Sequence, residues 1–239
     1  RSLTGGPEVA DAMRPTLVAV SGGADSAALA VALATLDTCR VVLGLVMHDL
    51  RPAELVHDDR RRLDSLARKL GVRLITEHCR VGEGNAEHAA RRARYSALEK
   101  MAAEAGCSFI ATGHHAHDQL ETLLLAMCRG ASPAAMRGIL RVRESQTPGI
   151  RVIRPALTET PDSAAAVCRA FGYEPRTDAT NRDPARARAW LRRRVVPTLA
   201  ERFPGLGECL DSTTAQLAGL LSGLPAEDLA EIGLEGIDT

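Results

Sequence analysis

Short apolar runs alternate with longer segments of helical periodicity, and this alternation limits the fold of the chain more than any other feature. Continuous apolar runs are typical of strands that are buried on both faces of a sheet. The sequence predicts strands at 17–20, 41–47, 72–76, 108–112 and 151–153, and helices at 27–36, 55–70, 86–105, 118–128, 162–171 and 187–201. We therefore expect an α/β fold with a doubly wound, Rossmann-like parallel sheet, which binds its ligands at the carboxyl ends of the strands.

Glycines mark the ends of three predicted helices. Gly71, Gly106 and Gly130 each stand where a helix ends, and glycine readily adopts the left-handed backbone of a C-cap. Beyond Leu206 the pattern is helical but weaker. We expect a catalytic domain over residues 1–205 and, over 206–239, a helical extension, a linker or the beginning of a further domain.

The composition argues against several classes of protein. Aromatic residues make up 3% of the chain, so we do not expect an aromatic platform for base stacking. The six cysteines form no C-x-x-C pair, which argues against a zinc site, a redox motif or a cysteine-held cluster and favours free thiols in a reducing cytoplasm. No run approaches the roughly 18 apolar residues of a membrane span. The chain opens with Arg1 rather than methionine, so we expect its natural start to lie upstream.

Arginine supplies nearly all of the positive charge. Lys69 and Lys100 are the only lysines among 30 basic residues, and the rest are arginine, whose planar fork suits phosphate. Seven arginines fall within 176–194 against only two acidic residues. This segment is either a solvated helix face or a phosphate-binding surface, and its charge alone leaves both interpretations open.

A glycine-containing loop follows the first predicted strand, and it reads Ser21-Gly22-Gly23-Ala24-Asp25-Ser26. Its glycines allow backbone N–H groups to approach an anion at the start of the next helix, which is the chemistry of a pyrophosphate site. The two serines add hydroxyl donors. Asp25 would repel phosphate unless it holds Mg²⁺ between them, so the loop predicts a metal as well as a nucleotide.

The S-G-G-x-D-S spacing differs from both G-x-G-x-x-G and G-x-x-x-x-G-K-[ST], which argues against dinucleotide binding and ordinary γ-phosphate hydrolysis. It resembles the PP-loop of the N-type ATP pyrophosphatases. That resemblance implies cleavage of ATP between the α and β phosphates and adenylation of a second substrate. The alternative is a glycine turn with a serine cap.

Three further segments, between residues 17 and 199, are similar to the tRNA(Ile)-lysidine synthetase family. The first is His48-Asp49-Leu50-Arg51-Pro52, where the family usually reads D-H-G-L-R. Met47 and Asp49 depart from that pattern. The resemblance implies that His48 and Arg51 join the loop in binding ATP.

The second segment runs from Asn85-Ala86-Glu87 through Arg94-Tyr95 to Thr112–Thr122, where the family reads G-H-H-x-D-D-x-x-E-T and His117 replaces the first aspartate. Asp118 and Glu121 are three apart, so both carboxylates project from one helical face. The resemblance implies that they bind the ammonium groups of a free lysine, with Arg94 on its carboxylate. It also supplies His114, which we expect to act in catalysis with Asp25 and Asp118. A zinc site at the crowded histidines and a merely capped helix are the alternatives.

The third segment begins with Arg154-Pro155 and continues at Asp178–Asp183 and Arg188–Arg192, similar to the family's R-P-L, D-x-S/T-N and R-N-x-x-R signatures, although Ala156 and Ala189 depart from them. The resemblance implies that Arg154, Asn181, Arg188 and Arg192 bind tRNA or ATP phosphates.

The two arginines of the last signature, Arg188 and Arg192, are four apart and share a helix face. An apolar stripe at 191, 195 and 199 lies on another face. We expect one face to pack and the other to be free to hold phosphate.

The family resemblance implies ligation of L-lysine to the wobble cytidine of a tRNA(Ile) with the anticodon CAU, with ATP and Mg²⁺. In the first step O2 of the cytidine would attack the α-phosphate, and in the second the lysine amine would attack C2, with Asp118 accepting its proton. Another PP-loop enzyme, such as a tRNA thiolase or a small-molecule synthetase, and a binding module without turnover remain open. The sequence does not determine the oligomeric state, and a homodimer is compatible with it.

Overall fold

The computed structural model describes residues 15–36, 39–48, 53–79, 86–176 and 187–222. The chain forms two compact units, each made of several stretches of sequence. The first unit comprises Arg1–Gly113, Val142–Pro155 and Asp162–Thr177. The second unit comprises His114–Arg141, Ala156–Pro161 and Asp178–Thr239.

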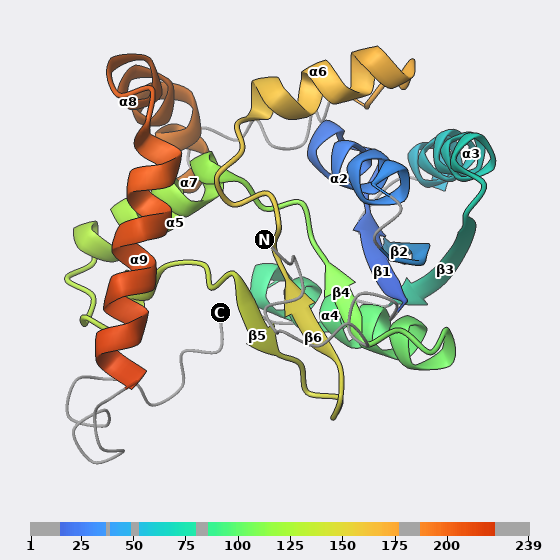
Figure 1. Ribbon diagram of the computed structural model, residues 1–239, viewed down its shortest axis with the longest axis horizontal. Coiled ribbons are helices and arrows are strands. Elements are labelled where there is room, and N and C mark those ends of the chain that lie inside the picture. Colours follow the sequence, from blue (N-terminus) through green and yellow to red (C-terminus); the bar gives the residue numbers. More distant parts are fainter. Residues whose placement is uncertain (1–14, 37–38, 49–52, 80–85, 177–186, 223–239) are drawn as a thin grey trace. The chain divides into compact units, whose positions relative to one another are not determined.

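A six-stranded sheet forms the centre of the first unit, with the strand order β3-β2-β1-β4-β6-β5 (Figure 1). The pairs between β1 and β2, β1 and β4, β2 and β3, and β4 and β6 are parallel, whereas β5 and β6 are antiparallel. The strands are β1 (Thr16–Val20), β2 (Val41–His48), β3 (Arg73–Cys79), β4 (Phe109–Ala111), β5 (Val142–Glu144) and β6 (Arg151–Ile153). The predicted parallel α/β sheet is confirmed, with an antiparallel edge strand added.

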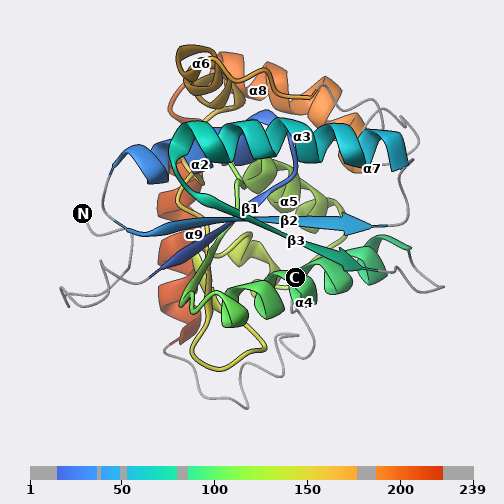
Figure 2. The ribbon, with the colours of Figure 1, turned by 90° about the vertical axis from the view of Figure 1, so that its right-hand side faces the viewer.

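Helices cover both faces of this sheet (Figure 2). On one face α2 (Ala24–Thr35), α3 (Ala53–Leu70) and α6 (Pro161–Phe171) share a core cluster that contains Leu43, Leu63 and Cys168. On the other face α4 (Ala86–Glu104) packs through Leu98 and Met101 against Ile110 and Val152. The apolar runs of the sequence thus become strands that are buried from both sides.

The predicted helix ends are also confirmed. Gly71 and Gly106 have φ of +67° and Gly130 has φ of +63°, the left-handed conformation expected at a helix C-terminus. The sequence did not predict β5. Val142–Glu144 is three residues long and carries two charged side chains, so it lacks the apolar run that predicts a strand.

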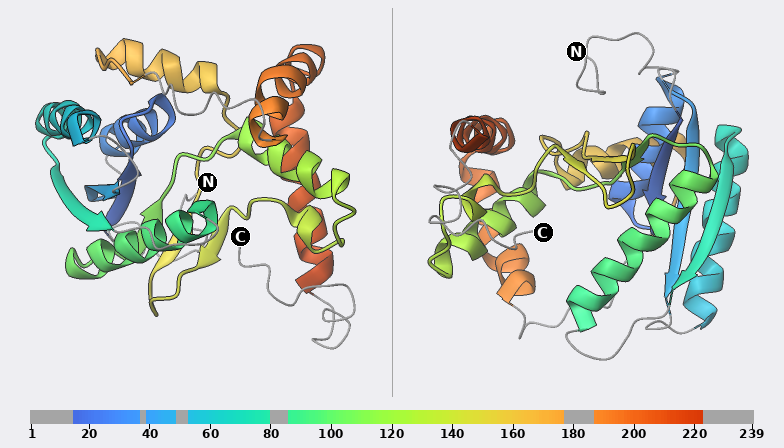
Figure 3. Two further views of the ribbon diagram at one scale, coloured as in Figure 1. Left: turned by 180° about the vertical axis from the view of Figure 1, so that it is seen from behind. Right: turned by 90° about the horizontal axis from the view of Figure 1, so that it is seen from below.

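The second unit is helical, and its elements are α5 (Ala116–Cys128), η1 (Ala135–Arg137), α7 (Ala187–Trp190), η3 (Leu191–Val195), α8 (Val196–Arg202) and α9 (Leu206–Ser222). Helix α9 packs against α5 and η1 (Figure 3). Gln119 on α5 is 2% exposed and donates from Nε2 to Thr214 Oγ1 of α9 at 3.3 Å. Helices α5 and α9 belong to the same compact unit, and the domain boundary at residue 205 stays a prediction.

One helix was predicted over 187–201, but a π-helical turn, η3, interrupts it. A π-turn adds one residue to the helical repeat. As a result Leu191 of the predicted apolar stripe is buried, at 6% exposure, but the next buried residue is Val196, at 0% exposure. Positions 195 and 199, predicted to continue the stripe, are only partly buried. No helix within the described ranges is long and apolar enough to cross a membrane.

Candidate functional site

The phosphate loop connects β1 to α2 and is held by its own serines. Ser26 Oγ accepts a hydrogen bond from the Ser21 N–H at 3.2 Å and donates to the Gly23 carbonyl at 3.2 Å. The two serine hydroxyls lie 3.3 Å apart. Ser26 is buried at 8% exposure, so its hydroxyl shapes the loop. Gly23 caps α2 without any side-chain hydrogen bond, and Ala24 begins the helix.

Two glycines of the loop region are required by close contacts. Gly22 has φ of +83°, and a Cβ there would lie 2.8 Å from Oδ1 of Asp59. A Cβ on Gly113, just beyond β4, would lie 3.0 Å from the backbone of Asp25 and Ser26. A side chain at Gly22 would be strained and would force Asp59 or the loop to shift, and one at Gly113 would press the loop backbone back by a few tenths of an ångström. Sequence reasoning missed Asp59, which lies in α3 and has no local motif.

Asp25 lies in the first turn of α2, where the helix dipole favours a carboxylate. Burial raises the pKa of the nearby Cys168 thiol, and the negative charge of Asp25 raises it further. The Asp25 carboxylate at the start of α2 fits Mg²⁺, because protein sites often hold this ion through one or two carboxylates together with substrate phosphates and water.

In the second unit a capping box places Asp118 at the start of α5. Nδ1 of His115 accepts from the Asp118 N–H at 3.3 Å, and Oδ2 of Asp118 accepts from the His115 N–H at 3.2 Å. Burial raises the pKa of Asp118, but His115, His114 and Arg192 outweigh it, so the pKa lies below its usual value. The carboxylate is therefore ionised at neutral pH and is a weaker base than an ordinary aspartate.

Glu121 is 0% exposed and lies among arginines. Its Oε2 accepts from Arg188 Nε at 2.9 Å, and its Oε1 accepts from Arg192 Nε at 2.6 Å. Arg192 Nη2 also donates to Asp118 Oδ1 at 2.8 Å. Both arginine side chains thus bind carboxylates of α5 while remaining partly exposed, and their binding of phosphate stays a prediction. Charged groups this well buried require such partners.

Three other predicted site residues differ in exposure. Arg94 is exposed, with its Cζ 5.9 Å from the centre of the Tyr95 ring, and His114 is half-buried. Arg154 is 2% exposed, and its charge, with those of Arg91 and Arg94, helps to lower the Tyr95 pKa against the opposing effect of burial. The low exposure of Arg154 does not favour a contact between its side chain and tRNA. His48 ends β2, whereas Arg51 and Asn181 lie outside the described residues.

The residues predicted to bind lysine are divided between the two units. Arg94 belongs to the first unit, and Asp118 and Glu121 belong to the second. The structure brings Asp118, Glu121, Arg188 and Arg192 together within the second unit. The lysine site as a whole stays a prediction.

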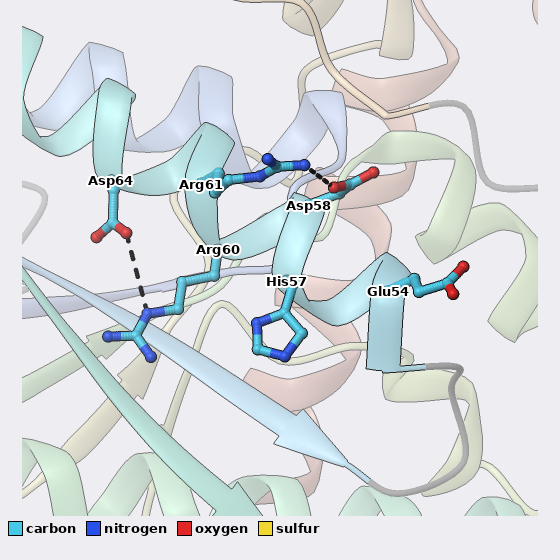
Figure 4. Close-up of a pocket in the computed structure, with 6 residues that line it drawn as sticks. All are labelled: Glu54, His57, Asp58, Arg60, Arg61 and Asp64. Carbon is cyan, nitrogen blue, oxygen red and sulfur yellow. Dashed lines mark hydrogen bonds and ion pairs between the residues drawn. The ribbon is translucent and has the colours of Figure 1, made fainter.

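A surface hollow of about 640 Å³ lies along α3 and is lined by Glu54, His57, Asp58, Arg60, Arg61 and Asp64 (Figure 4). Ion pairs within it join Arg61 to Asp58 and, at 3.9 Å, Arg60 to Asp64. All six residues come from one helix, and four of them already pair with one another. The hollow therefore has no convergent set of groups for a ligand.

Comparison with known proteins identifies the family of the chain. Residues 7–199 match the model of the PP-loop domain. The chain is 39% identical to the tRNA(Ile)-lysidine synthase of Symbiobacterium thermophilum, over 86% of the chain and 43% of the relative. It is 36% identical to the enzyme of that name from Salinispora arenicola, over 99% of the chain and 70% of the relative.

The fold is also found in a solved structure, that of the U34-tRNA thiolase of Methanococcus maripaludis. The TM-score is 0.73 at 14% identity, over 93% of this chain and 77% of that chain. The chain thus spans less than half the length of the first of these relatives and most of the second. Together with the loop between β1 and α2, the family model and the two relatives show that the chain belongs to the tRNA(Ile)-lysidine synthase family of PP-loop proteins.

Proposed function

We propose that the protein joins L-lysine to C2 of the wobble cytidine in the CAU anticodon of tRNA(Ile), with conversion of ATP to AMP and pyrophosphate. The observation that carries this proposal is the Ser21–Ser26 loop. It opens a helix of the sheet unit in a chain whose relatives are named tRNA(Ile)-lysidine synthase. Backbone N–H groups at a helix N-terminus suit the charge of a leaving pyrophosphate.

In the first step O2 of the cytidine attacks the α-phosphorus, the bond to the β-phosphate breaks, and an adenylated base forms. The loop from Ser21 to Gly23 and the N-terminus of α2 stabilise the charge that develops on pyrophosphate. Mg²⁺, held by Asp25, would supply further positive charge to the phosphates. His48 and Arg51 would complete the ATP site, and His114 would act beside the reacting groups. The cytidine must leave its stack, as readout of single-stranded RNA generally requires.

In the second step the ε-amine of lysine attacks C2, the bond from C2 to O2 breaks, AMP departs with that oxygen, and the amine loses a proton. Asp118 and Glu121 would bind the ammonium charge, and Arg94 the carboxylate, of the lysine. The lowered pKa of Asp118 favours this charge-binding role over that of proton acceptor. An incoming ammonium group would share or displace the bonds from Arg188 and Arg192, and Asn181 and the displaced arginines could then contact phosphate.

The direct test is incubation of the protein with ATP, labelled lysine and tRNA(Ile) bearing CAU. We expect label in the RNA and one AMP for each lysine. A tRNA with a different wobble base is the control. AMP formed without lysine transfer would indicate another PP-loop adenylating enzyme, and ATP binding without AMP would indicate a binding module. Asp25→Ala should abolish pyrophosphate release, whereas Glu121→Ala should spare it but weaken the use of lysine.

A further inference from the structure

We infer that the segment 172–176, which follows α6, positions the phosphate loop, with Tyr173 and Arg176 as positioning residues for ATP. The inference rests on the proposed binding of ATP by that loop. No motif of the sequence points to this segment. The contacts that support it lie within the first unit.

Two donors of the segment bind the carbonyl oxygen of Gly22. The Tyr173 hydroxyl donates to it at 3.3 Å, and the Arg176 N–H donates at 3.0 Å. Tyr173 is buried at 8% exposure. Burial raises the pKa of Tyr173 to about 12, with Cys168 and Asp59 acting in the same direction, so the phenol keeps its proton and remains a donor.

These two bonds fix the direction of the next N–H group. The peptide plane between Gly22 and Gly23 is rigid and trans, so the carbonyl of one residue and the N–H of the next point in opposite directions. The chain has no cis peptide bond in the described residues. A carbonyl held toward the segment therefore aims the Gly23 N–H away from it, and the inference assigns the bound anion to that side of the loop. Preorganised N–H groups of this kind stabilise phosphate charge without a cost of reorganisation.

The segment is itself anchored to one face of α3. Arg62 donates to the Glu174 carbonyl at 3.1 Å, and Lys69 donates to the Gly172 carbonyl at 3.1 Å. Asp59 pairs with Arg176 Nε at 3.0 Å. Positions 59, 62 and 69 lie on the same side of a helix because their spacings of three and seven are close to whole turns. The segment is thus tied to a rigid helix that is independent of the nucleotide.

The pair of Asp59 and Arg176 has a second effect, on charge. Asp59 is 3% exposed, and its carboxylate lies close behind Gly22. An unpaired carboxylate at that place would repel the phosphates of ATP, since charges interact strongly where water is excluded. Arg176 neutralises Asp59 while its own N–H holds the loop. One residue of the segment therefore contributes to both the geometry and the electrostatics of the loop.

Tyr173→Phe tests the inference, because it removes the hydroxyl and little else. The control is Tyr95→Phe, the same change at the other tyrosine of the chain, which is also 8% exposed but packs on the opposite face of the sheet. By isothermal titration calorimetry we expect the Kd for ATP to rise about fivefold in Tyr173→Phe, as loss of one hydrogen bond predicts, and to stay within about twofold in the control. The KM for ATP in pyrophosphate release should rise similarly, with kcat nearly unchanged.

The thermal unfolding midpoint separates positioning from a purely structural role, since a residue that only stabilises the fold would lower it without changing the affinity of the folded protein. An unchanged Kd in folded Tyr173→Phe would overturn the inference and leave the proposed function intact. Failure of the unaltered protein to bind ATP would instead count against the proposed function.

If Tyr173→Phe does not fold, the double variant Arg62→Gln with Lys69→Gln removes the two exposed anchors. It should weaken ATP binding about twofold or more, and wild-type affinity there would overturn the inference.

Discussion

Arg192 holds Glu121 with two nitrogens: Nε lies 2.6 Å from Oε1, and Nη2 lies 2.9 Å from Oε2. The side chain of Glu121 is 0% exposed, whereas that of Arg192 is 41% exposed. The carboxylate is therefore closed to solvent, and its oxygens are bound by Arg192 and by Arg188. A cationic ligand would have to compete with this arginine for the same oxygens.

Glu121→Gln should destabilise the second unit, because it leaves the guanidinium groups of Arg188 and Arg192 without their full counter-charge. Loss of one partner from a fully buried pair costs about 3–5 kcal/mol, and the partial exposure of both arginines lowers our expectation to about 1–3 kcal/mol. Urea unfolding measures the change. Glu201→Gln, at an exposed position of α8, is the control and should have little effect. Equal stability of the two variants would contradict a structural role for the Glu121 pairs.

Asp118 should contribute stability at neutral pH that is lost in acid. Its folded pKa is lowered below the value of about 3.9 in unfolded chains, so the contribution is present above pH 4 and disappears as pH falls through the folded pKa. Asp118→Asn should therefore be less stable than the unaltered protein at pH 7, and the gap should narrow below about pH 4. Thermal unfolding across this range measures the gap. A gap that widens in acid would contradict the direction of the pKa shift.

Gly113→Ala should weaken ATP binding, because the new Cβ would lie 3.0 Å from the backbone of Asp25 and Ser26. Backbone atoms cannot turn aside as a flexible side chain can, so the loop itself would have to move. Gly219→Ala is the control, since a Cβ there meets nothing within 4 Å and alanine favours the helix α9. Calorimetric titration with ATP compares the two. Wild-type affinity in Gly113→Ala would show that the loop tolerates a shift.

Cys107 should resist alkylation in the native protein. Burial raises the pKa of its thiol to about 11, with Arg73 acting in the opposite direction, so very little thiolate exists at pH 8. Cys128 and Cys209 are exposed and should react first with iodoacetamide. Mass spectrometry of partly labelled protein resolves the three sites. Labelling of Cys107 as fast as that of Cys209 would contradict its burial.

The strand and helix pattern could be predicted from the sequence because it depends on local periodicity and on glycine at helix ends. The sequence predicted strand 151–153 and the starts of β2 and α4 at the residues where the structure places them. It also predicted the strand, loop and helix around Gly22 and Gly23, since a loop of this kind needs its glycines in one short stretch. The ends of β3 and the whole of β5 depend on hydrogen bonds to a neighbouring strand. The local pattern of apolar and polar residues carries no information about that pairing.

For the candidate site, the sequence by itself singled out the candidate residues, which stay predictions: the loop with Asp25, and the carboxylates of Asp118 and Glu121 on one face of a helix. Only the tertiary structure decided their partners. Arg192 turns inward to Glu121 across more than seventy residues of sequence, and Tyr173 reaches Gly22 across an interval about twice as long. Such contacts arise because a buried charge or carbonyl must find a partner wherever the fold supplies one. Periodicity describes neighbours along the chain, and only packing brings distant residues together.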